Sequence, residues 1–126
     1  MAQVDSIIRL YPAQIRRLNQ AITTALEQAA EAVHTDVENA QVIPFDTGTL
    51  ERSTFVDTSQ SKNGYVSLVS DTPYARRLYF HPEYNFDQSE KPNAKGRWFE
   101  DYLPGGEKQE FAHEKFAEIL RRELGE

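Results

Sequence analysis

The fold of this chain is decided by residues 12–43, which read PAQIRRLNQAITTALEQAAEAVHTDVENAQVI. Apolar residues recur there at intervals of three and four, the spacing that places them on one side of an α-helix. Pro12 fits the first turn of such a helix, and we expect the helix to end before Pro44 because the residue before a proline avoids helical geometry. We therefore predict one helix of about eight turns. Its apolar stripe consists of Ile15, Leu18, Ile22, Ala25, Leu26, Ala29, Val33 and Val37.

The charges on this predicted helix run against its dipole. Arg16 and Arg17 lie near the positive N-terminal end, whereas Glu27 and Glu31 lie toward the negative C-terminal end. Glu27 and Glu31 are also a like-charged pair four residues apart, which costs about a few tenths of a kcal/mol. We predict that these charges meet another chain. The alternative is plain exposure to solvent, with the cost tolerated.

Downstream of this helix the sequence predicts a hairpin, a long loop and a second helix. Residues 53–59 and 65–70 alternate in polarity as strands do, and Asn63-Gly64 between them is a strong hairpin signal. We expect a short helix at 74–79, an edge strand or short helix at 98–103, and a final helix at 108–124. The predicted fold class is α+β: a long N-terminal helix packed on a small antiparallel sheet with a C-terminal helix. We predict a single domain, 1–126, that starts with an arm at 1–11.

Residues 81–97 form a long polar loop with no helical or strand period, and eight of the 14 aromatic residues lie between Tyr74 and Tyr102. Long irregular loops in small domains are commonly functional, and aromatic and Arg side chains are enriched at buried protein contacts. We therefore predict an assembly surface, and we expect Trp98→Ala to abolish assembly while leaving the monomer folded. The alternative is that the aromatics fill a small core. The predicted interface residues are Arg16, Arg17, Glu27, Glu31, Arg76, Arg77, Tyr84, Phe86 and Trp98.

Composition excludes several classes of function. The 126 residues include no cysteine, which rules out a disulfide framework, a thiol nucleophile and a Cys-based zinc site. The three histidines lack the spacing of a helical metal site, and no nucleophile or phosphate-loop motif is present, so we predict no enzyme, no cofactor and no metal. The net charge of −6, with only short basic pairs, disfavours tight nucleic-acid binding. No apolar run suits a membrane helix or a signal peptide, so we expect no membrane partner.

Three segments, in this order and spacing, resemble the minor capsid and head–tail connector proteins of long-tailed bacteriophages. Residues 44–53, PFDTGTLERS, resemble the family's corner of proline, acidic residue, Thr-Gly, Leu and Ser after a long helix. Residues 72–80, TPYARRLYF, resemble its Pro-Tyr-Ala step that leads to an aromatic residue. Residues 93–99, NAKGRWF, resemble the stretch ahead of its closing helix. The resemblance covers residues 12–124, and His81-Pro82 stands where other neck proteins carry a glycine.

The resemblance implies a structural role in the virion. It implies a closed homo-oligomeric ring at the neck, between the capsid portal and the tail, with head-to-tail contacts between copies. Neck and tail proteins would be its other partners, DNA would pass through without tight binding, and assembly would occur in the host cytoplasm. Two alternatives stay open: a small bacterial or phage protein-binding regulatory module that uses the same loop, and a small nuclease or hydrolase that uses His81 with Glu83 or Asp87.

Overall fold

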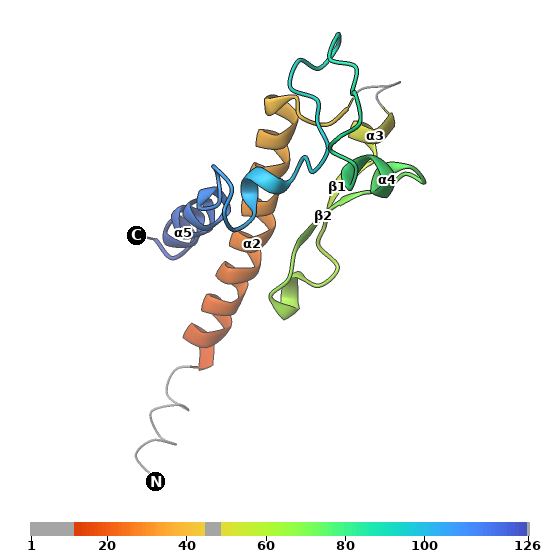
Figure 1. Cartoon of the computed structure of the whole chain (residues 1–126). Coiled ribbons are helices and arrows are strands. Elements are labelled where there is room, and N and C mark those ends of the chain that lie inside the picture. Colours follow the sequence, from red (N-terminus) through yellow and green to blue (C-terminus); the bar gives the residue numbers. More distant parts are fainter. Residues whose placement is uncertain (1–11, 45–48, 126) are drawn as a thin grey trace.

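The computed structural model describes residues 12–44 and 49–125, and it has the predicted α+β architecture. The expectations for the arm at 1–11 and for the 45–48 part of the corner lie outside these residues. Figure 1 shows helix α2 running through the molecule, with α5 on one side and the sheet and α4 on the other. The elements are α2 (Pro12–Ala40), α3 (Thr49–Arg52), β1 (Thr54–Asp57), β2 (Ser67–Ser70), α4 (Ala75–Tyr79) and α5 (Phe111–Glu123), with 3-10 turns at Ser61–Asn63 and Glu100–Tyr102.

Helix α2 has the predicted start and length, and it ends before Pro44 as predicted. Its last helical residue is Ala40, and Gln41 adopts a left-handed conformation with φ of 56°. A single left-handed residue is a common way for a helix to end. The reversal at Gln41 sends the chain back toward the body of the molecule, where Val42 and Ile43 are both buried.

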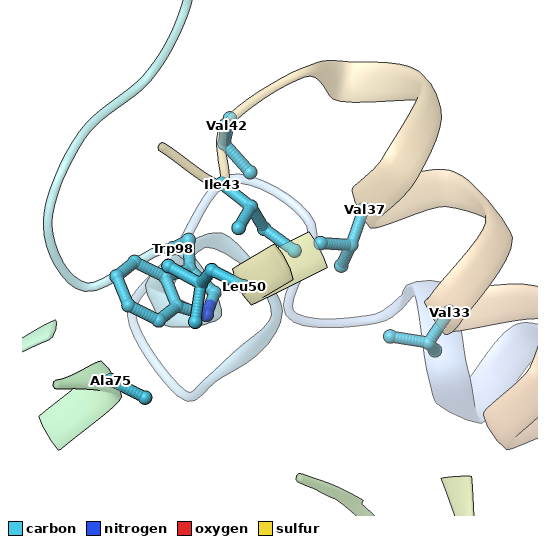
Figure 2. Close-up of a cluster of buried hydrophobic side chains, with 7 residues drawn as sticks. All are labelled: Val33, Val37, Val42, Ile43, Leu50, Ala75 and Trp98. Atoms are coloured by element: carbon cyan, nitrogen blue, oxygen red, sulfur yellow. The ribbon is translucent and has the colours of Figure 1, made fainter. Parts of the chain in front are cut away.

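Two groups of apolar side chains hold the fold together. The larger group joins the C-terminal half of α2 to α3, α4 and the segment after the long loop (Figure 2). Its buried members are Val33, Val37, Val42, Ile43, Leu50, Ala75 and Trp98. The smaller group lies where α5 crosses α2, with Ile119, Phe116 and Leu120 packed against Ala25 and Ala29. The predicted stripe is therefore a core stripe from Ala25 onward.

The sheet is a single antiparallel pair, β1 and β2, as predicted. Thr54 pairs with Ser70 and Asp57 with Ser67. The connection is longer than the predicted strands at 53–59 and 65–70 imply, because residues 58–66 connect β1 and β2 and include the 3-10 turn. Gly64 still supplies the left-handed residue at the end of that turn, with φ of 89°. The reversal was thus placed correctly, but its length was not.

The acidic end of α2 is neutralised partly within the chain. Asp36 lies 2.7 Å from the Lys108 ammonium and accepts a short hydrogen bond from the Tyr102 hydroxyl. Burial on its own would raise the pKa of Asp36, but the bonds from Lys108 and Tyr102 outweigh it and hold the pKa below its usual 3.8. The Asp36–Lys108 contact therefore ties α2 to the segment that leads into α5.

This contact predicts a loss of stability in acid. Because the folded-state pKa of Asp36 is lower than the unfolded one, its contribution is complete above the unfolded value and is lost as pH falls through the folded value. We expect the unfolding free energy of Asp36→Asn to fall less steeply than that of the wild type below about pH 4. The difference is less than about 1 kcal/mol, because the pair is partly exposed. Urea titrations of the wild type and the variant from pH 5 to pH 2 measure the unfolding free energy. The same dependence of this free energy on pH in both proteins would contradict the prediction.

Candidate interaction surface

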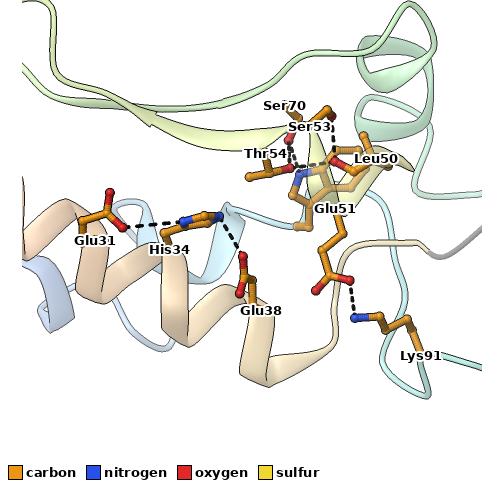
Figure 3. Close-up of polar contacts among 10 residues, drawn as sticks. Glu31, His34, Glu38, Leu50, Glu51, Ser53, Thr54, Ser70 and Lys91 are labelled. Carbon is orange, nitrogen blue, oxygen red and sulfur yellow. Dashed lines mark hydrogen bonds and ion pairs between the residues drawn. The ribbon is translucent and has the colours of Figure 1, made fainter. Parts of the chain in front are cut away.

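The loop at 81–97 is irregular, as predicted, and its second half is attached to the body of the chain. The Lys95 N–H donates to the Val42 carbonyl at 3.0 Å, and the Arg97 N–H donates to the Tyr79 carbonyl at 2.9 Å. The Lys91 ammonium lies 2.6 Å from the Glu51 carboxylate (Figure 3), and both side chains are largely buried. A Cβ on Gly96 would lie 2.8 Å from the Pro82 Cα, so the two halves of the loop touch closely there. This half of the loop is held by its own chain.

Trp98 is part of the core, so its prediction as an interface residue is wrong. The side chain is 0% exposed and lies beside Leu50 in Figure 2. Its indole N–H donates to the Ser70 hydroxyl at 3.2 Å, and the Tyr79 ring meets it edge-on at 4.9 Å between centroids. The attached half of the loop places the Trp98 ring in the core, where its apolar surface is buried and its indole N–H is hydrogen-bonded. No surface of Trp98 is left for a neighbour.

The exposed aromatic residues cluster with arginines at the end of α4. Phe80 is 52% exposed, and the guanidinium carbons of Arg76 and Arg97 lie 5.9 and 5.5 Å from its ring centroid. The Arg77 guanidinium lies 6.0 Å from the Tyr84 ring, and its hydrogen bond to Tyr84 raises the pKa of Arg77 further. We call Arg76, Arg77, Phe80, Tyr84 and Arg97 the Arg–aromatic patch. Exposed aromatic rings in contact with three Arg side chains are typical of a surface that binds a protein.

A groove borders the patch on the side of α3. Its volume is about 840 Å³. It is lined by apolar side chains such as Leu50, Leu78 and half-buried Phe86, and by polar side chains such as Asn85 and Asp87. Tyr84 stands between the groove and the patch, with its ring 6.4 Å from that of Phe86. Of the predicted interface residues, Arg76, Arg77, Tyr84 and Phe86 are thus brought together. Phe80 and Arg97, which the prediction omitted, belong with them.

The predicted charges on α2 lie away from this patch, and two of them are used within the chain. The Glu27 carboxylate accepts a hydrogen bond from the Ser61 hydroxyl at 2.7 Å, and Arg17 donates to the Leu124 carbonyl at 3.2 Å. Both side chains thus have a partner within the chain, and their contact with a neighbouring chain stays a prediction. Arg16 and Glu31 are exposed, and Glu31 lies 3.9 Å from His34 in Figure 3. A sequence shows the charge of a helix but not the distant groups that neutralise it.

His81 and Glu83, the pair that an enzyme would use, lie together on the surface. The His81 Nδ1 is 2.8 Å from the Glu83 carboxylate, and this bond holds the pKa of Glu83 below its usual range. The His81 ring stacks on Tyr84, 4.7 Å away and tilted by 8°. Asp87 accepts the Ser89 N–H at 2.9 Å instead. Within residues 12–44 and 49–125, no three histidine or acidic side chains gather as a metal site would require.

In comparisons with protein families, curated proteins and solved structures, no match to this chain is found. Among the described helices, none has both the length and the apolar character needed to cross a membrane.

Proposed function

We propose that this chain is a structural subunit of the neck of a long-tailed bacteriophage, where copies form a ring between the capsid connector and the tail. The phage assignment is supported by the resemblance of residues 44–53, 72–80 and 93–99 to the connector family. The observation that carries the ring is the Arg–aromatic patch, which is exposed and rich in the residue types of protein interfaces.

A closed ring of identical copies requires a second, different surface that complements the patch. Helix α5 with its N-cap residue Glu110 offers one, because Glu110, Glu114 and Glu118 recur at intervals of four and are all exposed. One of them, Glu118, has a loose contact with Lys115 at 3.6 Å. We call these three residues the acidic ridge. Patch and ridge are opposite in charge, and α4 and α5 lie on opposite sides of α2 in Figure 1.

In the proposed ring the acidic ridge of each copy docks on the Arg–aromatic patch of the next. Opposite charges steer the copies together and fix their register, and burial of Phe80 and Tyr84 supplies the apolar contact. The net charge of −6 keeps free subunits soluble and gives the assembled ring little attraction for passing DNA. The role is mechanical, and no catalytic group takes part.

The experiment that tests this proposal is native mass spectrometry of the purified chain, with negative-stain electron microscopy of the same sample. We expect closed rings of one size that appear as protein concentration rises and that dissociate in high salt, because exposed charge contacts are screened. A chain that shows no assembly above a dimer at several hundred micromolar and low salt would contradict the ring.

A further inference from the structure

The N-terminal half of α2 extends well beyond the helix that covers it. At about 1.5 Å per residue, the 29 residues of α2 span roughly 43 Å and the 13 residues of α5 roughly 20 Å. Ala25 and Ala29 are buried under α5, but Ile15 and Leu18 on the same stripe are 46% and 42% exposed. Figure 1 shows this part of α2 projecting past the rest of the described chain. The described fold leaves the apolar stripe uncovered there.

The stripe has the spacing of a coiled-coil seam. Ile15, Leu18, Ile22, Ala25 and Ala29 alternate steps of three and four, which is a heptad repeat with Ile15, Ile22 and Ala29 at a and Leu18 and Ala25 at d. The same steps continue in the sequence before Pro12, through Tyr11, Ile8 and Val4. In parallel coiled coils, β-branched residues at a with Leu at d favour two strands. The exposed half of the stripe therefore continues a helix-pairing seam that α5 already occupies at its other end.

The surroundings of the exposed seam suit a second copy of the same chain. Gln14 and Asn19, which flank it at g and e positions, are both uncharged, so two copies meet no like charges across the seam. Arg16 and Arg17 stand at b and c, away from the contact. An unrelated helix with charged e and g positions would gain no partner here.

We propose that two copies of this chain pair through the N-terminal halves of α2, parallel and in register, as a short two-stranded coiled coil. The contact is separate from the patch and ridge and does not depend on the ring. The uncovered described seam, from Ile15 to Ile22, spans about one heptad, which places the buried area below the roughly 1,200 Å² of a standard stable interface. We therefore expect weak pairing, with a dissociation constant in the micromolar range.

Single cysteines test the geometry, because the chain has none of its own. In a parallel, in-register pair Leu18 faces its own copy, so Leu18→Cys forms a disulfide dimer under mild oxidation. Gln20→Cys, two residues on at the f position, is the matched control, because it points away from the seam and does not cross-link. Both positions are exposed, so the fold is preserved.

A second variant tests the pairing without a covalent bond. Leu18→Asp places like charges opposite one another in the seam, and we expect it to weaken dimerisation at least tenfold in sedimentation equilibrium while the circular dichroism spectrum stays unchanged. Equal cross-linking of Leu18→Cys and Gln20→Cys, or a wild-type chain that stays monomeric at several hundred micromolar, would overturn the proposal.

Discussion

Replacing Trp98 by alanine destabilises the chain by about 3–5 kcal/mol, the usual cost of deleting a fully buried large aromatic ring. The side chain is 0% exposed, and its removal leaves a cavity between Leu50, Tyr79 and Ala75 while the Ser70 hydroxyl loses its indole donor. Small domains have only about 5–15 kcal/mol of stability in total. We therefore expect Trp98→Ala to be partly or wholly unfolded at 37 °C, in contrast to the folded monomer that the sequence predicted.

Thermal and urea unfolding followed by circular dichroism measure this effect. Tyr65→Ala is the matched control, because Tyr65 is an aromatic residue that is 67% exposed, and its loss changes stability by less than about 0.5 kcal/mol. If Trp98→Ala unfolds at the same urea concentration as the wild type, Trp98 is not a core residue. Its prediction as an interface residue would then be the better account.

Reversing the charges of the Arg–aromatic patch is expected to prevent the ring from forming. Arg76→Glu with Arg77→Glu would place acids opposite the acidic ridge of the next copy, and like charges facing across an interface cost several kcal/mol. Each 1.4 kcal/mol lost weakens a contact about tenfold. Because both arginines are exposed, we expect the fold itself to lose little stability, chiefly the contact between Arg76 and the Phe80 ring.

A charge swap separates this contact from a general effect of net charge. Adding Glu114→Arg and Glu118→Arg to the patch variant restores opposite signs between copies, and we expect the ring to return. Arg16→Glu with Lys62→Glu changes the net charge by the same amount as the patch variant, at exposed sites off the patch and the ridge, and should leave the ring intact. Loss of the ring in this control variant, or no recovery in the swap, would show that patch and ridge do not meet.

The sequence predicted the elements whose signals are local. Apolar spacing placed α2 and α5, Asn63-Gly64 placed the reversal between the strands, and the short helix at 74–79 is present as α4. The strands are shorter than the predicted 53–59 and 65–70, because residues 58–66 form the connection between them. Local patterns therefore gave the order of the elements better than their exact ends.

The candidate site was predicted only in part because burial depends on distant partners. Trp98 and Tyr84 are equally plausible interface aromatics in the sequence, and only the contacts of Trp98 with Ser70 and Tyr79 place it inside. Likewise, no residue near Glu27 in the sequence indicates that the Ser61 hydroxyl donates a hydrogen bond to it. Phe80 and Arg97 join the patch because the Arg97 N–H bonds to the Tyr79 carbonyl, across the whole loop.

The most direct test of the central claim is electron cryomicroscopy of the neck of tailed particles that contain this chain, labelled with an antibody fragment raised against it. We expect a single ring of label between portal and tail, with α5 of each subunit facing α4 of the next. Label on free protein alone, or a neck ring built from other chains, would contradict the account.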